Sequence, residues 1–351
     1  MNLEKILTDI LNQSDKVTQW DLKASYHLEN KHLHLGLKAG FPTKSLENTL
    51  VPTLEKALSH NLPDFQISIT MEQSIKAHRT QLAGKSLRGV KNTIAIASGK
   101  GGVGKSTVAV NLAIALAKAG ARVGLLDADI YGPSIPLMLG KVEPVEVKDD
   151  HYLPIMAHGI QAMSIGYLTD VNQALIWRGP MLAKSLLQML DLTLWDELDY
   201  LFIDLPPGTG DIQLSLVQKI PLAGAIVVTT PQNVATLDAQ KALTMFAKTN
   251  IDVLGVVENM SLHVCSQCGH QETIFGQGGG EQLASSFHVN LLGQLPLDRH
   301  ILKHCEEGKP TTARSDDNLA MAFNQTALQA AIALAKKPLN YADKFPPIVV
   351  V

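Results

Sequence analysis

The chain of 351 residues is short of several features, and each shortage narrows the classes of protein it could belong to. It has only three cysteines, Cys265, Cys268 and Cys305, whereas a secreted disulfide scaffold would use more. No stretch of about 18 apolar residues is free of charge, so no transmembrane helix is expected. The first residues lack the basic start and apolar core of a secretory signal. Together these shortages favour a cytoplasmic location.

An excess of charge of either sign is also missing. The chain has 30 basic and 33 acidic residues, which gives a formal net charge of −3. This charge offers no general reason to expect nucleic acid or an anionic membrane as a partner. Aromatic residues make up only 5 %, but hydrophobic residues reach 46 %, so a sizeable core is expected. The length suits one large domain with an appendage, or two domains.

The first part of the chain has its own pattern of apolar residues. Residues 1–75 are predicted to form a small α-β-α-β domain. Apolar residues have helical spacing over 3–11 and 46–58, and they alternate as in strands over 33–37 and 65–71. Residues 76–91 are polar, rich in Lys and Arg and contain two glycines, so they are predicted to be a linker.

From residue 92 to residue 337, short apolar runs alternate with helical stretches. Several runs are apolar on both faces, which is typical of parallel strands covered by helices; the predicted strands are Thr93–Ser98, Arg122–Asp127, Ile160–Ile165, Tyr200–Leu205, Ala225–Thr230, Val253–Glu258 and Leu291–Leu295. We therefore predict an α/β fold with a mainly parallel sheet and helices on both faces. Ligands of such sheets bind beyond the carboxyl ends of the strands. Residues 338–351 are predicted to be a C-terminal tail.

The segment after the first of these strands carries two overlapping glycine patterns. Its glycines fit the dinucleotide pattern G-x-G-x-x-G, and Asp127 lies at roughly the right distance for it. The segment also fits the P-loop pattern G-x-x-x-x-G-K-S/T, and only a P-loop needs the cation of Lys105 and the hydroxyl of Ser106. We predict a P-loop whose nucleotide-binding residues are Gly99, Lys100, Gly101, Gly102, Val103, Gly104, Lys105, Ser106 and Thr107.

Acidic residues follow two of the other predicted strands. A P-loop needs a carboxylate at the end of another strand, and Asp204 provides it. We predict that Asp204 holds Mg²⁺ through water, because this ion dehydrates reluctantly. Asp127 and Asp129 end the second strand, where their spacing places both near the γ-phosphate. Asp127 is predicted to support Mg²⁺ together with Ser106.

Cys265 and Cys268 form a C-x-x-C pair in a polar, glycine-rich loop predicted at residues 260–280. The pair could be a redox dithiol, although it does not open a helix in a thioredoxin-like context. It could be half of a zinc site with His263 or His270 as a third ligand, or half of an iron–sulfur site completed by a second chain. It could also be unligated. The motif by itself favours zinc and iron–sulfur equally.

Several stretches resemble the Mrp/ApbC/Nbp branch of the P-loop ATPases, whose members carry iron–sulfur clusters. They occur in the order and spacing of that family over about residues 90–335, at Gly99–Thr107, Asp127–Gly140, Trp177–Pro180, Asp204–Gln213, Pro231–Gln232, Gly255–Ser261, Cys265–Gly269 and Ile274–Gly276. The resemblance implies the deviant Walker A variety of the P-loop fold. It favours iron–sulfur over zinc at the cysteine pair.

The resemblance also implies roles for individual residues. Lys100 would reach across a dimer interface to the partner's nucleotide and act in catalysis with Lys105, since a cation there neutralises charge in phosphoryl transfer. Asp129 would position or activate the attacking water. Asn259 would read the adenine of ATP, with turn capping as the rival interpretation.

At the level of the whole protein, the resemblance implies a homodimer that holds a 4Fe–4S cluster between two cysteine pairs. Mg²⁺-dependent ATP hydrolysis would be coupled to transfer of the cluster from donors to apoproteins, with no nucleic acid or membrane involved. The N-terminal domain would be a degenerate relative of the MIP18-like domain, since it contains no cysteine. The alternatives are a positioning ATPase like MinD or ParA and a regulatory ATPase with a structural zinc.

Overall fold

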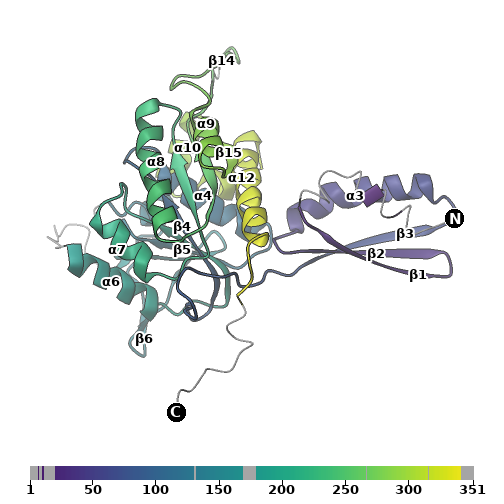
Figure 1. Ribbon diagram of the computed structural model, residues 1–351, viewed down its shortest axis with the longest axis horizontal. Helices are drawn as coiled ribbons and strands as arrows, with labels where there is room; N and C mark the ends of the chain where they lie inside the picture. Colours follow the sequence, from purple (N-terminus) through teal and green to yellow (C-terminus); the bar gives the residue numbers. More distant parts are fainter. Residues whose placement is uncertain are drawn as a thin grey trace. The chain divides into compact units, whose positions relative to one another are not determined.

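The computed structural model describes residues 7, 10, 11, 20–129, 132–168, 179–265, 267–314 and 316–340. The chain divides into two compact units, one of residues 1–76 with the turn 118–121, the other of residues 77–117 and 122–351 (Figure 1). Parts of the predicted helix over 3–11, the pair Trp177–Arg178 and the tail beyond residue 340 lie outside the described residues.

The first unit is built on a three-stranded sheet in the order β1-β2-β3, with one helix, α3. Its elements are β1 (Lys23–Glu29), β2 (His32–Ala39), α3 (Lys44–Asn61) and β3 (Gln66–Gln73). Alternate leucines of β2 are buried, as are the leucines that recur every four residues along α3. Strand β1 was not predicted. Every residue of this edge strand is exposed, so it has no buried face to impose an alternating apolar pattern.

The second unit contains an eight-stranded sheet in the order β15-β12-β11-β4-β10-β5-β9-β8. All its neighbours are parallel except β8, which pairs with β9 in the antiparallel sense. The strands are β4 (Val90–Ala97), β5 (Val123–Asp127), β8 (Ile155–Ala157), β9 (Ile160–Ser164), β10 (Leu198–Asp204), β11 (Gly224–Thr229), β12 (Val253–Glu258) and β15 (Asn290–Gln294).

Helices connect and cover these strands, as the prediction of an α/β fold requires. They are α4 (Lys105–Lys118), α5 (Ile135–Met138), α6 (Gly179–Leu192), α7 (Asp211–Lys219), α8 (Asn233–Lys248), α9 (Gly279–Ser286), α10 (Arg299–Glu306), α11 (Thr311–Arg314) and α12 (Asn318–Ala335), with a 3-10 turn at Ile165–Tyr167. Ala95 and Ala97 of β4 belong to a core shared with helices α6 to α9, and the alternating Ile94 and Ile96 are equally buried. The sheet is therefore covered on both faces.

The seven strands predicted for this unit all occur, with boundaries within a few residues of those expected. The fold class is confirmed. The short elements were missed: strand β8, the hairpin of β6 (Val147–Lys148) and β7 (His151–Tyr152), and the hairpin of β13 (His263–Val264) and β14 (Gln271–Glu272). Two or three residues are too few to show a period.

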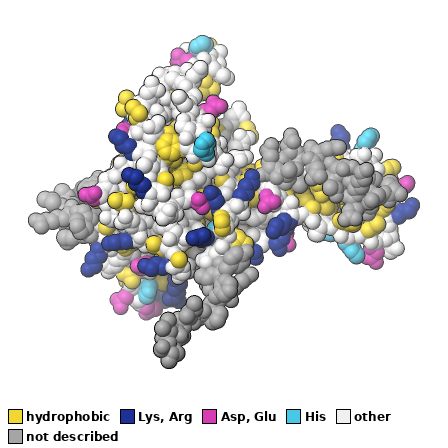
Figure 2. Space-filling view, in the orientation of Figure 1, with side chains coloured by type: hydrophobic (Ala, Val, Ile, Leu, Met, Phe, Trp, Pro, Cys, Tyr) yellow, Lys and Arg dark blue, Asp and Glu magenta, His cyan; other side chains and the backbone are white. Residues whose placement is uncertain are grey.

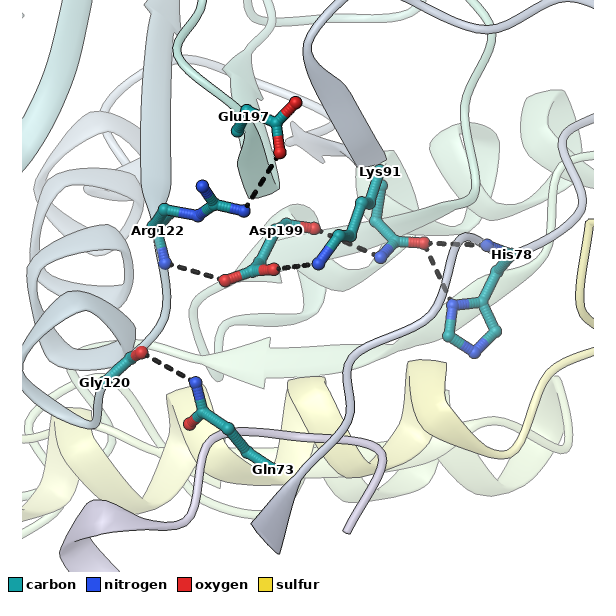
Figure 3. Close-up of polar contacts among 8 residues, drawn as sticks. Gln73, His78, Lys91, Gly120, Arg122, Glu197 and Asp199 are labelled. Carbon is teal, nitrogen blue, oxygen red and sulfur yellow. Dashed lines mark hydrogen bonds and ion pairs between the residues drawn. The ribbon is translucent and has the colours of Figure 1, made fainter.

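Residues 77–91, expected to be part of a linker, are bonded to the second unit. His78 pairs with Leu339 in an antiparallel bridge, and its backbone N–H donates to the side-chain oxygen of Asn92 (Figure 3). The side-chain amide of Gln81 donates to the carbonyls of Val217 and Ile220. A polar segment can be bound this way without the apolar periodicity that identifies a helix or strand.

An ion pair joins the amino-terminal ends of two central strands, β4 and β10. Lys91 Nζ lies 2.7 Å from Asp199 Oδ1, and the other oxygen of Asp199 accepts from the backbone N–H of Arg122 (Figure 3). Within the described residues, no helix combines the length and the apolar character needed to cross a membrane.

Candidate functional site

The phosphate loop lies between β4 and α4, beyond the carboxyl end of the strand. Gly102 and Gly104 have φ values of 81° and 80°, which L-residues with side chains rarely adopt. A Cβ on Gly104 would lie 2.3 Å from the side-chain nitrogen of Asn259, and one on Gly99 would lie 2.1 Å from the backbone of Asp238. Gly101 and Gly102, by contrast, face open space. The loop is tightly packed on one side and open on the other, where backbone N–H groups could meet phosphates.

Lys105 and Ser106, the first residues of α4, both contact the same carboxylate. Lys105 Nζ lies 2.6 Å from Asp204 Oδ1, and the hydroxyl of Ser106 donates to Asp204 Oδ2 at 2.5 Å. The Lys105 side chain is 6 % exposed and that of Asp204 is 0 % exposed. The structure thus brings together the predicted cation, hydroxyl and carboxylate of a P-loop.

Asp127 is the register partner of Asp204 on the neighbouring strand β5. Burial and, to a lesser extent, the nearby negative charge of Asp204 raise the pKa of Asp127 to about 8. The hydroxyl of Ser164 donates to one carboxylate oxygen of Asp127 at 3.0 Å, and the backbone N–H of Asp129 donates to the other. A divalent cation beside the two buried carboxyl groups would favour the ionised form of both, and their oxygens are the ligands that Mg²⁺ prefers, so these residues fit Mg²⁺.

Asn259, at the end of β12, contacts the phosphate loop directly. Its side-chain amide donates to the backbone carbonyl of Val103 at 2.9 Å, and its backbone N–H donates to Thr229. Neither predicted role, adenine recognition or turn capping, anticipated this contact. Lys100 is half-buried, and within the described residues its ammonium group makes no hydrogen bond or ion pair.

Asp129 lines a cavity of about 640 Å³ beside the segment that follows Asp204. Pro206, Pro207 and Gly210 contribute to the wall, as does Gln213 from the first turn of α7. The residue predicted to activate water thus lies beside a cavity formed in part by the loop that begins at Asp204. Ile130 and Tyr131, which follow Asp129 in the matching motif, lie outside the described residues.

Cys265 and Cys268 lie in the turn of the hairpin formed by β13 and β14. The backbone N–H of Cys265 donates to His270, and that of Gly269 donates back to Cys265, which closes the turn. Cys268 is exposed and Cys265 is half-buried. Hydrogen bonds from the backbone N–H groups of Gln267 and Cys268 lower the pKa of the Cys265 thiol. A thiolate is the form that ligates metals.

Three polar residues that lie beside predicted site residues were not predicted to have a role. Ser164 ends β9 beside Asp127. Glu258 is buried at the end of β12, where its carboxylate accepts from the backbone N–H of Gly280 at the start of α9 and from the side chain of Gln294. The third is Gln213. Gln213 ends the stretch Asp204–Gln213 and Glu258 lies within the stretch Gly255–Ser261, but no role was predicted for either, and Ser164 lies in none of the matching stretches.

A glycine loop between a central strand and a helix, with a buried lysine, a hydroxyl and a carboxylate from a second strand, defines a P-loop nucleoside triphosphatase. The family model described as a NUBPL iron-transfer P-loop NTPase, of the ParA type, matches residues 89–332, and the chain belongs to this family.

Curated relatives agree with this assignment. The chain is 49 % identical to the iron-sulfur cluster carrier protein of Escherichia coli (strain K12) over 301 residues, covering 85 % of this chain and 78 % of that protein. It is 56 % identical to the iron-sulfur cluster carrier protein of Haemophilus influenzae over 252 residues, covering 71 % and 68 %. The predicted resemblance is confirmed.

Solved structures show the same fold. The nucleotide-binding protein of Archaeoglobus fulgidus in complex with ADP is 38 % identical, with a TM-score of 0.58 over 66 % of this chain and 91 % of that one. The cell division ATPase MinD of Pyrococcus furiosus is 24 % identical, with a TM-score of 0.52 over 68 % and 97 % of the two chains, and its likeness concerns the fold alone.

Proposed function

We propose that this protein is an ATP-hydrolysing carrier of iron–sulfur clusters that holds a 4Fe–4S cluster between two copies of the chain. The observation that carries the proposal is the contrast in completeness between its two sites. The nucleotide site has every residue type that a P-loop needs, whereas the hairpin presents two thiols. No three His, Cys, Asp or Glu side chains converge on a common point in the described part of the chain. A cubane cluster takes about four ligands, which two hairpins would supply.

In the nucleotide site, the phosphate loop would bind ATP, with Lys105 directed at the β- and γ-phosphates. Ser106, Asp127 and Asp204 would hold Mg²⁺, which supplies positive charge to the phosphate oxygens as the γ-phosphoryl group is transferred. Asp129 would take up a proton from the attacking water. Lys100, whose ammonium group has no ion pair within the described residues, would serve the nucleotide of the partner subunit.

The remaining parts of the proposal concern partners and location. A cluster held at a hairpin turn by the half-buried Cys265 and the exposed Cys268 would be accessible to cluster donors and to apoproteins that receive it. Free thiols suit the reducing cytoplasm. The relatives in Escherichia coli and Haemophilus influenzae carry the name of iron-sulfur cluster carriers, which supports this reading.

A positioning ATPase like MinD or ParA would share the nucleotide site but has no need of the cysteine pair. Helix α12 buries its apolar residues within the unit, unlike a basic amphipathic helix that binds membranes. On the face shown in Figure 2, Lys and Arg side chains lie in small groups among other residue types rather than in one continuous basic surface. These features favour the carrier.

The proposal is tested by anaerobic reconstitution with iron and sulfide, followed by metal analysis, visible absorption and measurement of the oligomeric state. We expect a brown dimer with about four irons. Cys268→Ala should remain colourless, whereas Cys305→Ala, which removes a buried thiol outside the hairpin, should bind the cluster like the wild type. A colourless wild-type protein that retains zinc through the same cysteines would refute the carrier function and make the hairpin a structural zinc site.

A further inference from the structure

Gln213 is a buried side chain whose polar atoms have no use in the fold. It is 2 % exposed, and within the described residues neither its Oε1 nor its Nε2 has a hydrogen-bond partner. Burying an amide without hydrogen bonds destabilises a protein, so such a group calls for an explanation beyond folding. Gln161, another buried glutamine, is different: its Oε1 accepts from the backbone N–H of Asp196 and its Nε2 donates to the carbonyl of the same residue.

The position of Gln213 supplies that explanation. It lies in the first turn of α7 and lines the cavity of about 640 Å³ that Asp129 also lines. Pro206 and Pro207, which form part of the wall, follow Asp204 by two and three residues. The unsatisfied amide therefore shares a space with the proposed water-activating carboxylate, beside the loop that begins at the proposed Mg²⁺ ligand.

The chemistry of hydrolysis requires a second group at this place. An ionised carboxylate only accepts hydrogen bonds, so Asp129 alone leaves the attacking water free to rotate and to shift. A carboxamide both donates and accepts and carries no charge that would repel the phosphates. A carboxylate and an amide together can hold a water in one orientation, which lowers the entropic part of the barrier.

We infer that Gln213 orients the attacking water together with Asp129 during ATP hydrolysis. The inference rests on the proposed ATPase function. In the step, the water oxygen forms a bond to the γ-phosphorus, and the bond from this phosphorus to the bridging oxygen breaks with its electron pair going to ADP. Asp129 accepts the proton that the water loses and passes it to the inorganic phosphate. Gln213 stays neutral and unchanged throughout.

The experiment compares Gln213→Met and Gln213→Ala with the matched control Gln161→Met. Steady-state ATP hydrolysis gives kcat and KM with Mg²⁺ present, and thermal unfolding of the nucleotide-free proteins gives the unfolding midpoint. For Gln213→Met we expect kcat to fall about tenfold to a hundredfold, with KM changed less than about twofold. The midpoint should stay or rise, because the substitution removes an unsatisfied amide. Gln161→Met should lower the unfolding midpoint, because it removes the hydrogen bonds with Asp196, and should leave kcat unchanged.

Gln213→Ala controls for a steric clash of methionine with its surroundings, because alanine is too small to clash. Its kcat should fall about as much as that of Gln213→Met. Wild-type kcat in both Gln213 variants would overturn the inference and leave the amide without a role in turnover. A loss of kcat that follows an equal loss of stability would also overturn it, in favour of a packing role. If the wild type hydrolyses ATP no faster than Lys105→Ala, the proposed ATPase function fails instead, and the inference fails with it.

Discussion

The nucleotide site and the cysteine hairpin differ in almost every physical property, although both follow strands of the same sheet. In the first, the side chains of Lys105 and Asp204 are buried, and both bond, together with Ser106, within one chain. The second lies in the turn of a hairpin whose two strands have two residues each, and it offers two thiols, one exposed and one half-buried. A site that one chain completes can be stable alone, whereas a site left half complete points to a second chain. The difference thus separates binding of the nucleotide and Mg²⁺, whose predicted residues one chain supplies, from cargo binding, which depends on assembly.

The largest effect is expected from Lys105→Ala. ATP binding should be lost, and the free energy of unfolding should fall by about 3 kcal/mol, because Asp204 is left buried without its counter-charge. Nucleotide titration and chemical denaturation measure both quantities. Lys91→Ala is the matched control, because the ion pair of Lys91 with Asp199 is more exposed and lies at the opposite end of the strands. In this variant we expect the free energy of unfolding to fall by about 1 kcal/mol and ATP binding to stay normal. Equal losses of ATP binding in both variants would refute the assignment of Lys105.

The second largest effect tests whether the cysteine hairpin can be changed without affecting the nucleotide site. Cys265→Ala should reduce the iron bound after reconstitution from about four per dimer to near zero, because a cubane loses two of its four ligands. Basal ATP affinity and unfolding stability should not change, since the turn is exposed and outside the core. A variant that keeps a stable cluster would contradict the ligand assignment, and one that loses ATP affinity would show that the two regions are not separable.

Lys100→Ala should leave ATP binding largely intact and slow hydrolysis by about a thousandfold, the lower range for a cation supplied in trans. Mixing this variant with Lys105→Ala sharpens the test. In a mixed dimer, the first subunit binds ATP and the second donates its intact Lys100, so one active site is restored. Recovery of ATPase activity on mixing supports action across the interface; activity no greater than the sum of the separate variants argues that Lys100 acts within its own chain.

The smallest effect concerns the reactivity of the thiols in metal-free protein. Burial raises the pKa of Cys305 to about 11, whereas backbone hydrogen bonds lower that of Cys265. Because the thiolate is the nucleophile, alkylation of Cys265 should level off at a lower pH than that of an ordinary cysteine, and Cys305 should react only at much higher pH. A raised pKa also means that Cys305 contributes stability below pH 9.0 that is lost as the pH rises to about 11. Mass spectrometry after timed alkylation measures the rates, and rapid labelling of Cys305 at neutral pH would contradict its burial.

The sequence predicted the central sheet well because strands such as β10 and β11 are buried on both faces, and burial leaves an unbroken apolar run. It predicted the phosphate loop because glycine, lysine and hydroxyl occupy fixed positions in a short segment. It missed strand β1, whose residues are all exposed, and the binding of residues 77–91, which depends on polar contacts with distant parts of the chain.

Within the site, too, the sequence failed to predict features that depend on contacts between distant parts of the chain. The contact of Asn259 with Val103 joins residues 156 positions apart, and the contact of Ser164 with Asp127 depends on β9 lying beside β5. Gln213 lies in a matching stretch, but no role was predicted for it, because an amide without hydrogen-bond partners can be identified only once its surroundings are known. Local spacing predicts a site whose residues are close in sequence; pairing across strands has to be observed.

The hydrogen bond from Asn259 to the carbonyl of Val103 has a thermodynamic consequence. Only five residues separate Asn259 from Cys265, so a change in the phosphate loop on ATP binding has a short covalent route to the hairpin. If ATP alters the affinity for the cluster by some factor, linkage requires the cluster to alter the affinity for ATP by the same factor. A loaded carrier would then sense nucleotide differently from an empty one, and the cargo would act as an effector of the site that governs its release.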